Sequence, residues 1–271
     1  MKTFISAFIL SSAMLLYGGT ISNLGVSYKY HLQGIAADET GIYWSFTDTL
    51  VKTDYDCKVL KEAAISGNHG GDLCVAGGKI YLAVLLRDPQ MIAANNNSRS
   101  MVFCYTPDLV LEKRYVLPFK EGIDGITFYK NRFYIAPDTG KAVKKKGVID
   151  VFDPQFNFLK RCEFTTDTLK KYGAQNLTTV NGLILAAFYD DGTTSPLLDP
   201  ETLQPVSYIP IRPSSGMAQI PEKISGNSRT FLLGFLSGKR ENWKCAARKI
   251  TISPDNKVKR LISSPSARPS K

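Results

Sequence analysis

The chain has 271 residues, with 34 Lys and Arg against 24 Asp and Glu, a hydrophobic fraction of 44% and an aromatic fraction of 11%. These proportions exclude a disordered chain, and 21 Gly, 14 Pro and 5 Cys are too few for a collagen-like protein or a disulfide scaffold. The length allows one large domain with a substantial core. The net charge of +10 is scattered along the chain, so we expect no nucleic-acid binding.

The N-terminus has the features of an export signal. Lys2 precedes an uncharged apolar stretch, residues 4–17, which is too short to span a bilayer but has the length of a signal-peptide core. We expect a signal peptide over residues 1–22 and a periplasmic or secreted protein; the alternative is a buried N-terminal helix or strand. No later segment has the apolar length of a transmembrane helix. Three small residues offer cleavage positions: Gly18, Gly19 and Ser22.

A unit of four short strands recurs along the rest of the chain, with a period near fifty residues. Gly- or Asn-rich turns separate its first two strands, and an Asp at the end of its third strand is expected to close a hairpin by accepting backbone N–H bonds. These aspartates are Asp54, Asp108, Asp153, Asp199 and Asp255. Short antiparallel strands with this period predict an all-β fold, a β-propeller of five blades. The expected blades span residues 31–66, 67–120, 121–168, 169–212 and 213–263.

The sequence predicts one propeller domain over residues 23–263 and a flexible tail, rich in Ser and Pro, over 264–271. Residues 21–30 form one further strand, which either completes a blade or indicates a sixth. A closed propeller needs no partner for its stability, so we expect a monomer. The five cysteines contain no C-x-x-C pair and are expected to be buried free thiols.

Both histidines of the chain occur at the same phase of the repeat, where the first strand of a blade begins. Because the first strands of all blades line the central channel, the residues that begin them should meet at one mouth. The expected ligand-binding residues are His31, Gln33, His69, Asp72, Asp124, Gln175 and Asn176. They predict a site for a small polar ligand, derived from a sugar or a peptide. In the alternative interpretation, the same side chains satisfy unpaired backbone groups around the channel.

Several chemistries are compatible with these residues. His31, His69, Asp72 and Asp124 are the catalytic candidates, because imidazole acts as a general base near neutral pH and a carboxyl group can orient or protonate. A divalent metal could be held by His31, His69 and Asp72, although the sequence requires no cofactor. Asp72 and Asp124 could also form the carboxyl pair of a glycoside hydrolase. A third class of function is a protein-interaction scaffold that uses its blade edges and leaves the channel inert.

Two resemblances follow from short segments of the repeat. The first resemblance rests on three segments: His31-Leu32-Gln33-Gly34-Ile35, Asn68-His69-Gly70-Gly71-Asp72-Leu73 and Gly122-Ile123-Asp124-Gly125-Ile126. With these segments the chain resembles exported bacterial propellers of largely uncharacterised function. More distantly, Gln33-Gly34-Ile35 is similar to part of a segment in propeller-type glutaminyl cyclases, which convert N-terminal Gln to pyroglutamate. That family has an acidic residue after the Tyr of the next strand, whereas Trp44 follows Tyr43 here. The resemblance therefore leaves Asp72 or Asp124 to supply the carboxylate.

Overall fold

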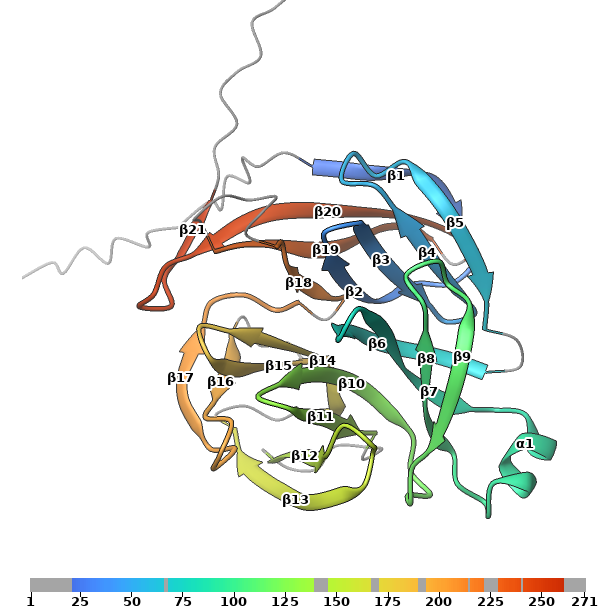
Figure 1. Cartoon of the computed structure of the whole chain (residues 1–271). Helices are drawn as coiled ribbons and strands as arrows, with labels where there is room; N and C mark the ends of the chain where they lie inside the picture. Colours follow the sequence, from blue (N-terminus) through green and yellow to red (C-terminus); the bar gives the residue numbers. More distant parts are fainter. Residues whose placement is uncertain are drawn as a thin grey trace, which may run out of the picture.

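The computed structural model describes residues 21–65, 68–138, 146–166, 171–189, 194–213, 215–221, 229–239 and 241–260. They form five antiparallel sheets around one axis, which confirms the predicted five-bladed propeller (Figure 1). The predicted signal peptide, apart from Ile21 and Ser22, and the predicted tail lie outside the described residues. Within the described ranges, no helix has the length and apolarity needed to cross a membrane.

The first four blades each follow the chain from the axis outwards, strand by strand. Blade 1 contains β2 (Leu32–Asp38), β3 (Gly41–Phe46), β4 (Thr49–Thr53) and β5 (Val59–Ala64). Blade 2 contains β6 (Asn68–Ala76), β7 (Lys79–Leu86), β8 (Ser100–Tyr105) and β9 (Leu111–Val116), with helix α1 (Pro89–Ala94) between β7 and β8. Blade 3 contains β10 (Ile123–Tyr129), β11 (Arg132–Pro137), β12 (Lys146–Phe152) and β13 (Phe158–Thr165). Blade 4 contains β14 (Lys171–Val180), β15 (Leu183–Tyr189), β16 (Ser195–Leu198) and β17 (Pro205–Ile209).

Blade 5 joins the two ends of the described chain. Its inner strands are β18 (Met217–Gln219), β19 (Thr230–Lys239) and β20 (Asn242–Ile252). The first half of β20 pairs with β1 (Ile21–Tyr28), and the second half pairs with β21 (Val258–Arg260) (Figure 1). The strand predicted at residues 21–30 therefore completes a blade and does not begin a sixth.

Strand β1 also contacts blade 1, so it closes the ring. The Tyr28 ring stacks on Phe46 with 4.0 Å between ring centroids, and its hydroxyl donates to Glu62 at 2.7 Å. Leu24 is 4% exposed and belongs to the apolar cluster between blades 5 and 1. Because β1 reaches Ile21, cleavage at Gly18 or Gly19 would leave the strand whole, whereas cleavage at Ser22 would shorten it.

We expect Leu24→Ala to lower the free energy of unfolding by about 2 kcal/mol, because it removes buried methyl groups from this closing cluster. Urea denaturation of the full chain measures the loss. Val26→Ala on the same strand is the matched control, since Val26 is 43% exposed, and it should cost less than about 0.5 kcal/mol. Equal losses in the two variants would contradict a role of β1 in closure.

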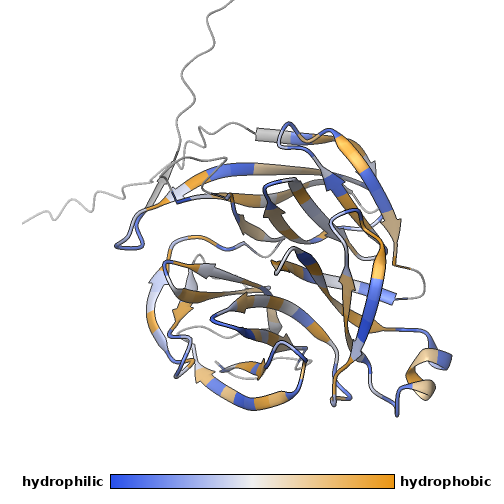
Figure 2. Ribbon diagram, in the orientation of Figure 1, coloured by the Kyte–Doolittle hydropathy of each residue, from blue (hydrophilic) through white to orange (hydrophobic). Residues whose placement is uncertain are grey.

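Five apolar clusters hold the blades together, one between each pair of neighbours. The outermost strands are mostly exposed, and β9 and β13 carry both polar and apolar residues (Figure 2). The five cysteines form no disulfide with one another, and all but Cys162 are buried, as predicted.

The hairpins between third and fourth strands confirm the turn prediction at three positions and correct it at two. Asp54, Asp153 and Asp199 each accept two backbone N–H bonds within the turn. In blades 2 and 5, Thr106 and Ser253 take that position, so Asp108 and Asp255 lie two residues later. Near the end of each turn one residue has positive φ: Cys57, Leu109, Phe156, Leu203 and Asn256. The first four are buried, and burial of an apolar side chain outweighs the roughly 1 kcal/mol cost of that backbone conformation.

Candidate functional site

The inner strands β2, β6, β10, β14 and β18 neighbour one another around the axis, each beside the next. All of them begin at the same end of the channel, which we call the histidine end because His31 and His69 lie there. The structure divides the seven predicted site residues into two groups. His31, Gln33 and His69 form one hydrogen-bonded chain, and Asp124 contacts Gln175. Asp72 and Asn176 lie one position further along their strands and have other partners.

Gln33 links the two histidines. The end of its side-chain amide that is placed as Nε2 lies 2.9 Å from His31 Nε2 and 2.8 Å from His69 Nε2. On the other side of His69, Arg87 Nη2 lies 3.0 Å from Nδ1. The chain therefore runs from a buried amide through a partly buried imidazole to an exposed guanidinium.

Proton placement fixes the tautomer of His69. A guanidinium can only donate, so Nδ1 accepts from Arg87 and the ring proton is on Nε2. The Gln33 atom beside Nε2 must then be an acceptor, and a half-turn of the amide places its oxygen there. The same oxygen accepts from His31 Nε2 and is 3.4 Å from the Thr47 hydroxyl. With both histidines neutral, each hydrogen bond in the series from Arg87 through His69 and Gln33 to His31 has one donor and one acceptor.

Electrostatics keep these imidazoles neutral. Burial, the positive charge of Arg87 and the neighbouring His31 lower the pKa of His69 to about 4. Burial also lowers the pKa of His31. At neutral pH both rings are therefore uncharged.

Among the predicted site residues, Asp124 supplies the carboxyl group at the histidine end. Its Oδ2 accepts from Gln175 Nε2 at 2.9 Å, and the residue is 8% exposed. Burial, and then the negative charge of Asp138, raise the pKa of Asp124 to about 7, against the opposing effects of the Gln175 bond and Arg87. A carboxyl group with this pKa is present in both protonation states near neutral pH, which suits general acid or base catalysis.

Asp72 and Asn176 form what we call the axial hub, a set of hydrogen bonds that joins all five blades. Asp72 Oδ2 accepts the backbone N–H of Ile126 at 3.3 Å and of Leu177 at 2.9 Å, so it ties blade 2 to blades 3 and 4. Asn176 Nδ2 donates to the Gln33 carbonyl at 2.6 Å, and its Oδ1 accepts from Gly216 N at 2.8 Å, which adds blades 1 and 5. Both side chains are buried, and burial raises the pKa of Asp72 well above its usual value. These two residues satisfy backbone groups around the channel, the alternative that the sequence left open.

Three glycines at the same phase make room for the hub. A Cβ on Gly34 would lie 2.5 Å from Asp72 Oδ1, and one on Gly125 would lie 2.8 Å from the Ala174 carbonyl. Gly216 has φ of +105°, a conformation that side chains disfavour, and its N–H is the one that Asn176 accepts. These glycines therefore permit close backbone approach at the axis.

The three candidate metal ligands have other partners. The Nε2 atoms of His31 and His69 face Gln33, while the Asp72 carboxylate accepts backbone N–H groups. Over the ranges that the structure describes, no group of three His, Cys, Asp or Glu side chains is placed to hold a metal ion. The two carboxyl groups considered for glycoside hydrolysis have different partners, because Asp72 accepts backbone N–H groups in the hub and Asp124 accepts from Gln175.

Sequence reasoning missed Arg87, Asp138 and Tyr189. Each comes at or directly after the end of the second strand of its blade, and Thr47 occupies the same place in blade 1. The second strand runs antiparallel to the first, so its end returns to the mouth where the first strand begins. That position in the repeat was the available signal, because in blades 1 to 4 the end of the second strand supplies a further residue to the histidine end.

Comparisons with known proteins identify the fold. The sequence matches no family model and no curated protein. The structure is similar to the glutaminyl cyclase of Myxococcus xanthus, with a TM-score of 0.59 and 11% identity over 88% of this chain and 97% of that one. It is also similar to CoXyl43, a GH43 β-xylosidase/α-arabinofuranosidase from a compost microbial metagenome, with a TM-score of 0.60 and 9% identity over 90% and 98%. A protein of unknown function from Bacteroides caccae matches with a TM-score of 0.50 and 12% identity over 84% and 80%.

These similarities place the chain in the class of five-bladed β-propellers. The propeller-type glutaminyl cyclases that the sequence resembles are among its structural neighbours. At these identities the likeness shows the fold alone. Trp44, which follows Tyr43 where the sequence resemblance implies an acidic residue, is fully buried and donates to Thr53 Oγ1 at 3.0 Å.

Proposed function

We propose that the histidine end binds a small polar ligand, derived from a sugar or a peptide, that carries an anionic group. The observation that carries this proposal is the chain from Gln33 through His69 to Arg87, which links two neutral imidazoles to an exposed cation. A guanidinium gives charge-assisted hydrogen bonds to a carboxylate, and the imidazoles and Gln175 offer polar partners to hydroxyl or amide groups. We also infer that the protein is exported by the leader predicted over residues 1–22.

The second candidate function is acid–base catalysis at the same place, and Asp124 is the observation that favours it. A carboxyl group with a pKa near 7 can exchange protons with substrate at neutral pH, and neutral His31 can act as the complementary base, because Arg87 and Gln33 engage both ring nitrogens of His69. For an N-terminal Gln peptide, the α-amine would attack the side-chain carbonyl and lose a proton to the base, and the protonated acid would supply the proton that leaves with ammonia.

A ligand screen with matched variants tests the binding proposal. We expect a Gln-containing dipeptide with a free carboxylate, or a sugar acid such as glucuronate, to raise the thermal midpoint of the full chain. The shift should vanish in the His31→Ala, His69→Ala double variant, and affinity should fall at least about tenfold in Arg87→Gln, because a charge-assisted bond is lost. Arg99→Gln is the control, since Arg99 is also exposed and lies in the same connection between β7 and β8.

The outcomes separate the three classes of function. Turnover that falls about 10²–10⁴-fold in Asp124→Asn with binding retained would establish the enzyme. Binding without turnover would establish a binding protein. If neither probe binds, or if they bind equally to the double variant, the proposal fails and the scaffold interpretation, with a protein partner and an inert channel, takes its place.

A further inference from the structure

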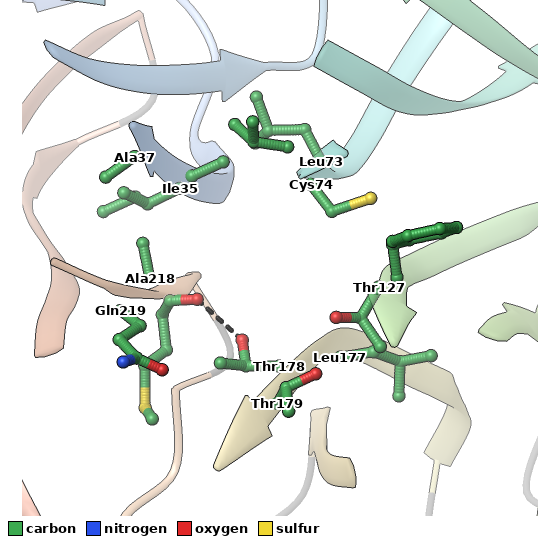
Figure 3. Close-up of a pocket in the computed structure, with 14 residues that line it drawn as sticks. Ile35, Ala37, Leu73, Cys74, Thr127, Leu177, Thr178, Thr179, Ala218 and Gln219 are labelled. Carbon is green, nitrogen blue, oxygen red and sulfur yellow. Dashed lines mark hydrogen bonds between the residues drawn. The ribbon is translucent and has the colours of Figure 1, made fainter. Parts of the chain in front are cut away.

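A cavity of about 240 Å³ lies at the opposite end of the channel from the histidines, and we call it the channel cavity. All five inner strands line it, at positions that follow the axial hub along each strand (Figure 3). The lining segments are Ile35–Ala37, Leu73–Val75, Thr127–Phe128, Leu177–Thr179 and Met217–Gln219. Because the hub lies between this cavity and the histidine end, the two ends of the channel are separate places.

Small side chains at one position of the repeat leave this space open. Two residues after the hub position, the five inner strands carry two alanines, one cysteine and two threonines: Ala36, Cys74, Thr127, Thr178 and Ala218. At the hub position itself, the side chains of Asp72 and Asn176 occupy the axis with their hydrogen bonds. The channel is therefore closed at the hub and open beyond it.

Strand edges give the wall of the cavity its polar groups. Side chains of each blade pack against the neighbouring blades, whereas the free edge of the innermost strand faces the axis. Antiparallel pairing alternates along a strand, and the two-residue turn after each of β2, β6, β10 and β14 places the small residues in bonds to the second strand. The residues on either side of them turn their N–H and C=O groups to the channel, as those of Ile126 and Leu177 that reach Asp72 do.

The hydroxyl group of Thr127 is the observation that points to a ligand. Thr127 is 5% exposed, lines the cavity and directs its oxygen into it (Figure 3). Among the residues that the structure describes, none hydrogen-bonds to Thr127 Oγ1. The nearby Thr178 hydroxyl donates to the Met217 carbonyl at 2.6 Å, so its lone pairs can still accept. A hydroxyl group this deeply buried costs free energy unless a molecule in the cavity bonds to it.

We propose that the channel cavity binds a small neutral polyol. No lining residue carries a charge, so the wall offers no ionic partner. Backbone N–H and C=O groups and the Thr127 hydroxyl call for both acceptors and donors, and every hydroxyl group of a polyol supplies both. A cavity of about 150 Å³ accommodates benzene, so this one suits about ten non-hydrogen atoms, the size of a five-carbon polyol. The proposal is independent of the function proposed for the histidine end, where the ligand is anionic and meets Arg87.

Two five-carbon probes test the site in the full chain by amide NMR titration. Xylitol has five hydroxyl groups and 1,5-pentanediol has two, so the probes share a chain length and differ in hydrogen bonding. We expect saturable xylitol binding with a Kd of about 1–10 mM, the affinity typical of a ligand of this size. The shifted amides should be those of Ala37, Val75, Phe128 and Thr179. The diol should bind at least about tenfold more weakly, because it forms up to three fewer hydrogen bonds.

Three variants test the role of the Thr127 hydroxyl group. Thr127→Val removes the hydroxyl at nearly constant shape and should weaken xylitol about fivefold. Thr127→Ser keeps the hydroxyl and should bind within about twofold of the wild type, because the hydrogen bond is retained. Thr179→Val is the matched control: Thr179 Oγ1 also lacks a protein partner, but it is sealed from the cavity, so its loss should not change xylitol binding.

The double variant His31→Ala, His69→Ala separates this proposal from the function proposed for the histidine end. It should bind xylitol as the wild type does, whatever becomes of anion binding at the other end. Shifts that grow linearly with xylitol and do not saturate, equal affinities for the two probes, or equal losses in Thr127→Val and Thr179→Val would overturn the proposal.

Discussion

Asn176→Ala is expected to lower the free energy of unfolding by about 4 kcal/mol. The substitution leaves the buried Gln33 carbonyl of blade 1 and the buried Asp72 side chain without the donor that Asn176 supplies. It also removes one of the two acceptors of the Gly216 N–H of blade 5, which keeps the Pro213 carbonyl. Each orphaned group costs about 1–3 kcal/mol, and the lost side chain leaves a void at the axis. Urea denaturation monitored by circular dichroism measures the loss.

The matched control is Asn157→Ala, which removes one exposed hydrogen bond to Asp153 in a blade turn. It should cost less than about 1 kcal/mol, because water replaces an exposed partner. Similar losses in the two variants would show that the axial hub adds nothing beyond an ordinary hydrogen bond. Asp72→Ala should destabilise comparably to Asn176→Ala, and the double variant should lose less than the two single losses together, since Asn176 also donates to Asp72.

The hub explains how a propeller with short inner strands is held together at its centre. The five clusters between neighbouring blades act pairwise, and none of them spans the axis. Two polar side chains are enough to join all five blades, because each inner strand brings backbone groups to the axis at the same phase. The same bonds hold the Gln33 backbone, so Asn176 also positions the side chain that links the histidines.

Sequence periodicity predicted the blades well, because turns and apolar strands occur at the same positions in each repeating unit. Every observed blade lies inside its expected span, apart from β1, whose place in blade 5 depends on pairing across more than two hundred residues. The phase of His31 and His69 also predicted that they meet, since both begin inner strands of neighbouring blades.

The division between site and hub could not be predicted from the same pattern. Asp72 and Asp124 both follow a glycine or isoleucine at the start of an inner strand, yet one joins blades and the other faces Gln175. The reason is a register shift in the pairing of β2, β6, β10 and β14 at this phase. A bulge re-aims the side chains beside it, so alternation along the strand no longer tells which direction a residue faces.

The second large effect is expected in the pH dependence of stability, where His69 and Asp124 act in opposite directions. His69 has a folded pKa of about 4, below its unfolded value, so the unfolded state binds more protons between about pH 4 and 6.5. Stability from His69 therefore falls as the pH falls through this window. Asp124 has a folded pKa of about 7, above its unfolded value, so its contribution is full below about pH 4 and is lost as the pH rises towards 7.

Because the two windows overlap, their effects nearly cancel in the wild type, and single variants should reveal them. In Asp124→Asn the free energy of unfolding should rise by about 2 kcal/mol from pH 4.5 to 7, because His69 then acts unopposed; the value is reduced for the partial exposure of His69. In His69→Gln it should fall over the same range by a similar amount, because Asp124 then acts unopposed. Both variants keep the charged or titratable neighbours that shift these two pKa values, which are Arg87, Asp138 and His31. These neighbours therefore do not account for the opposite slopes. Urea titrations at closely spaced pH values measure the free energy of unfolding as a function of pH. Parallel curves for the wild type and both variants would refute the assignment of a neutral His69 and a half-protonated Asp124 at the histidine end.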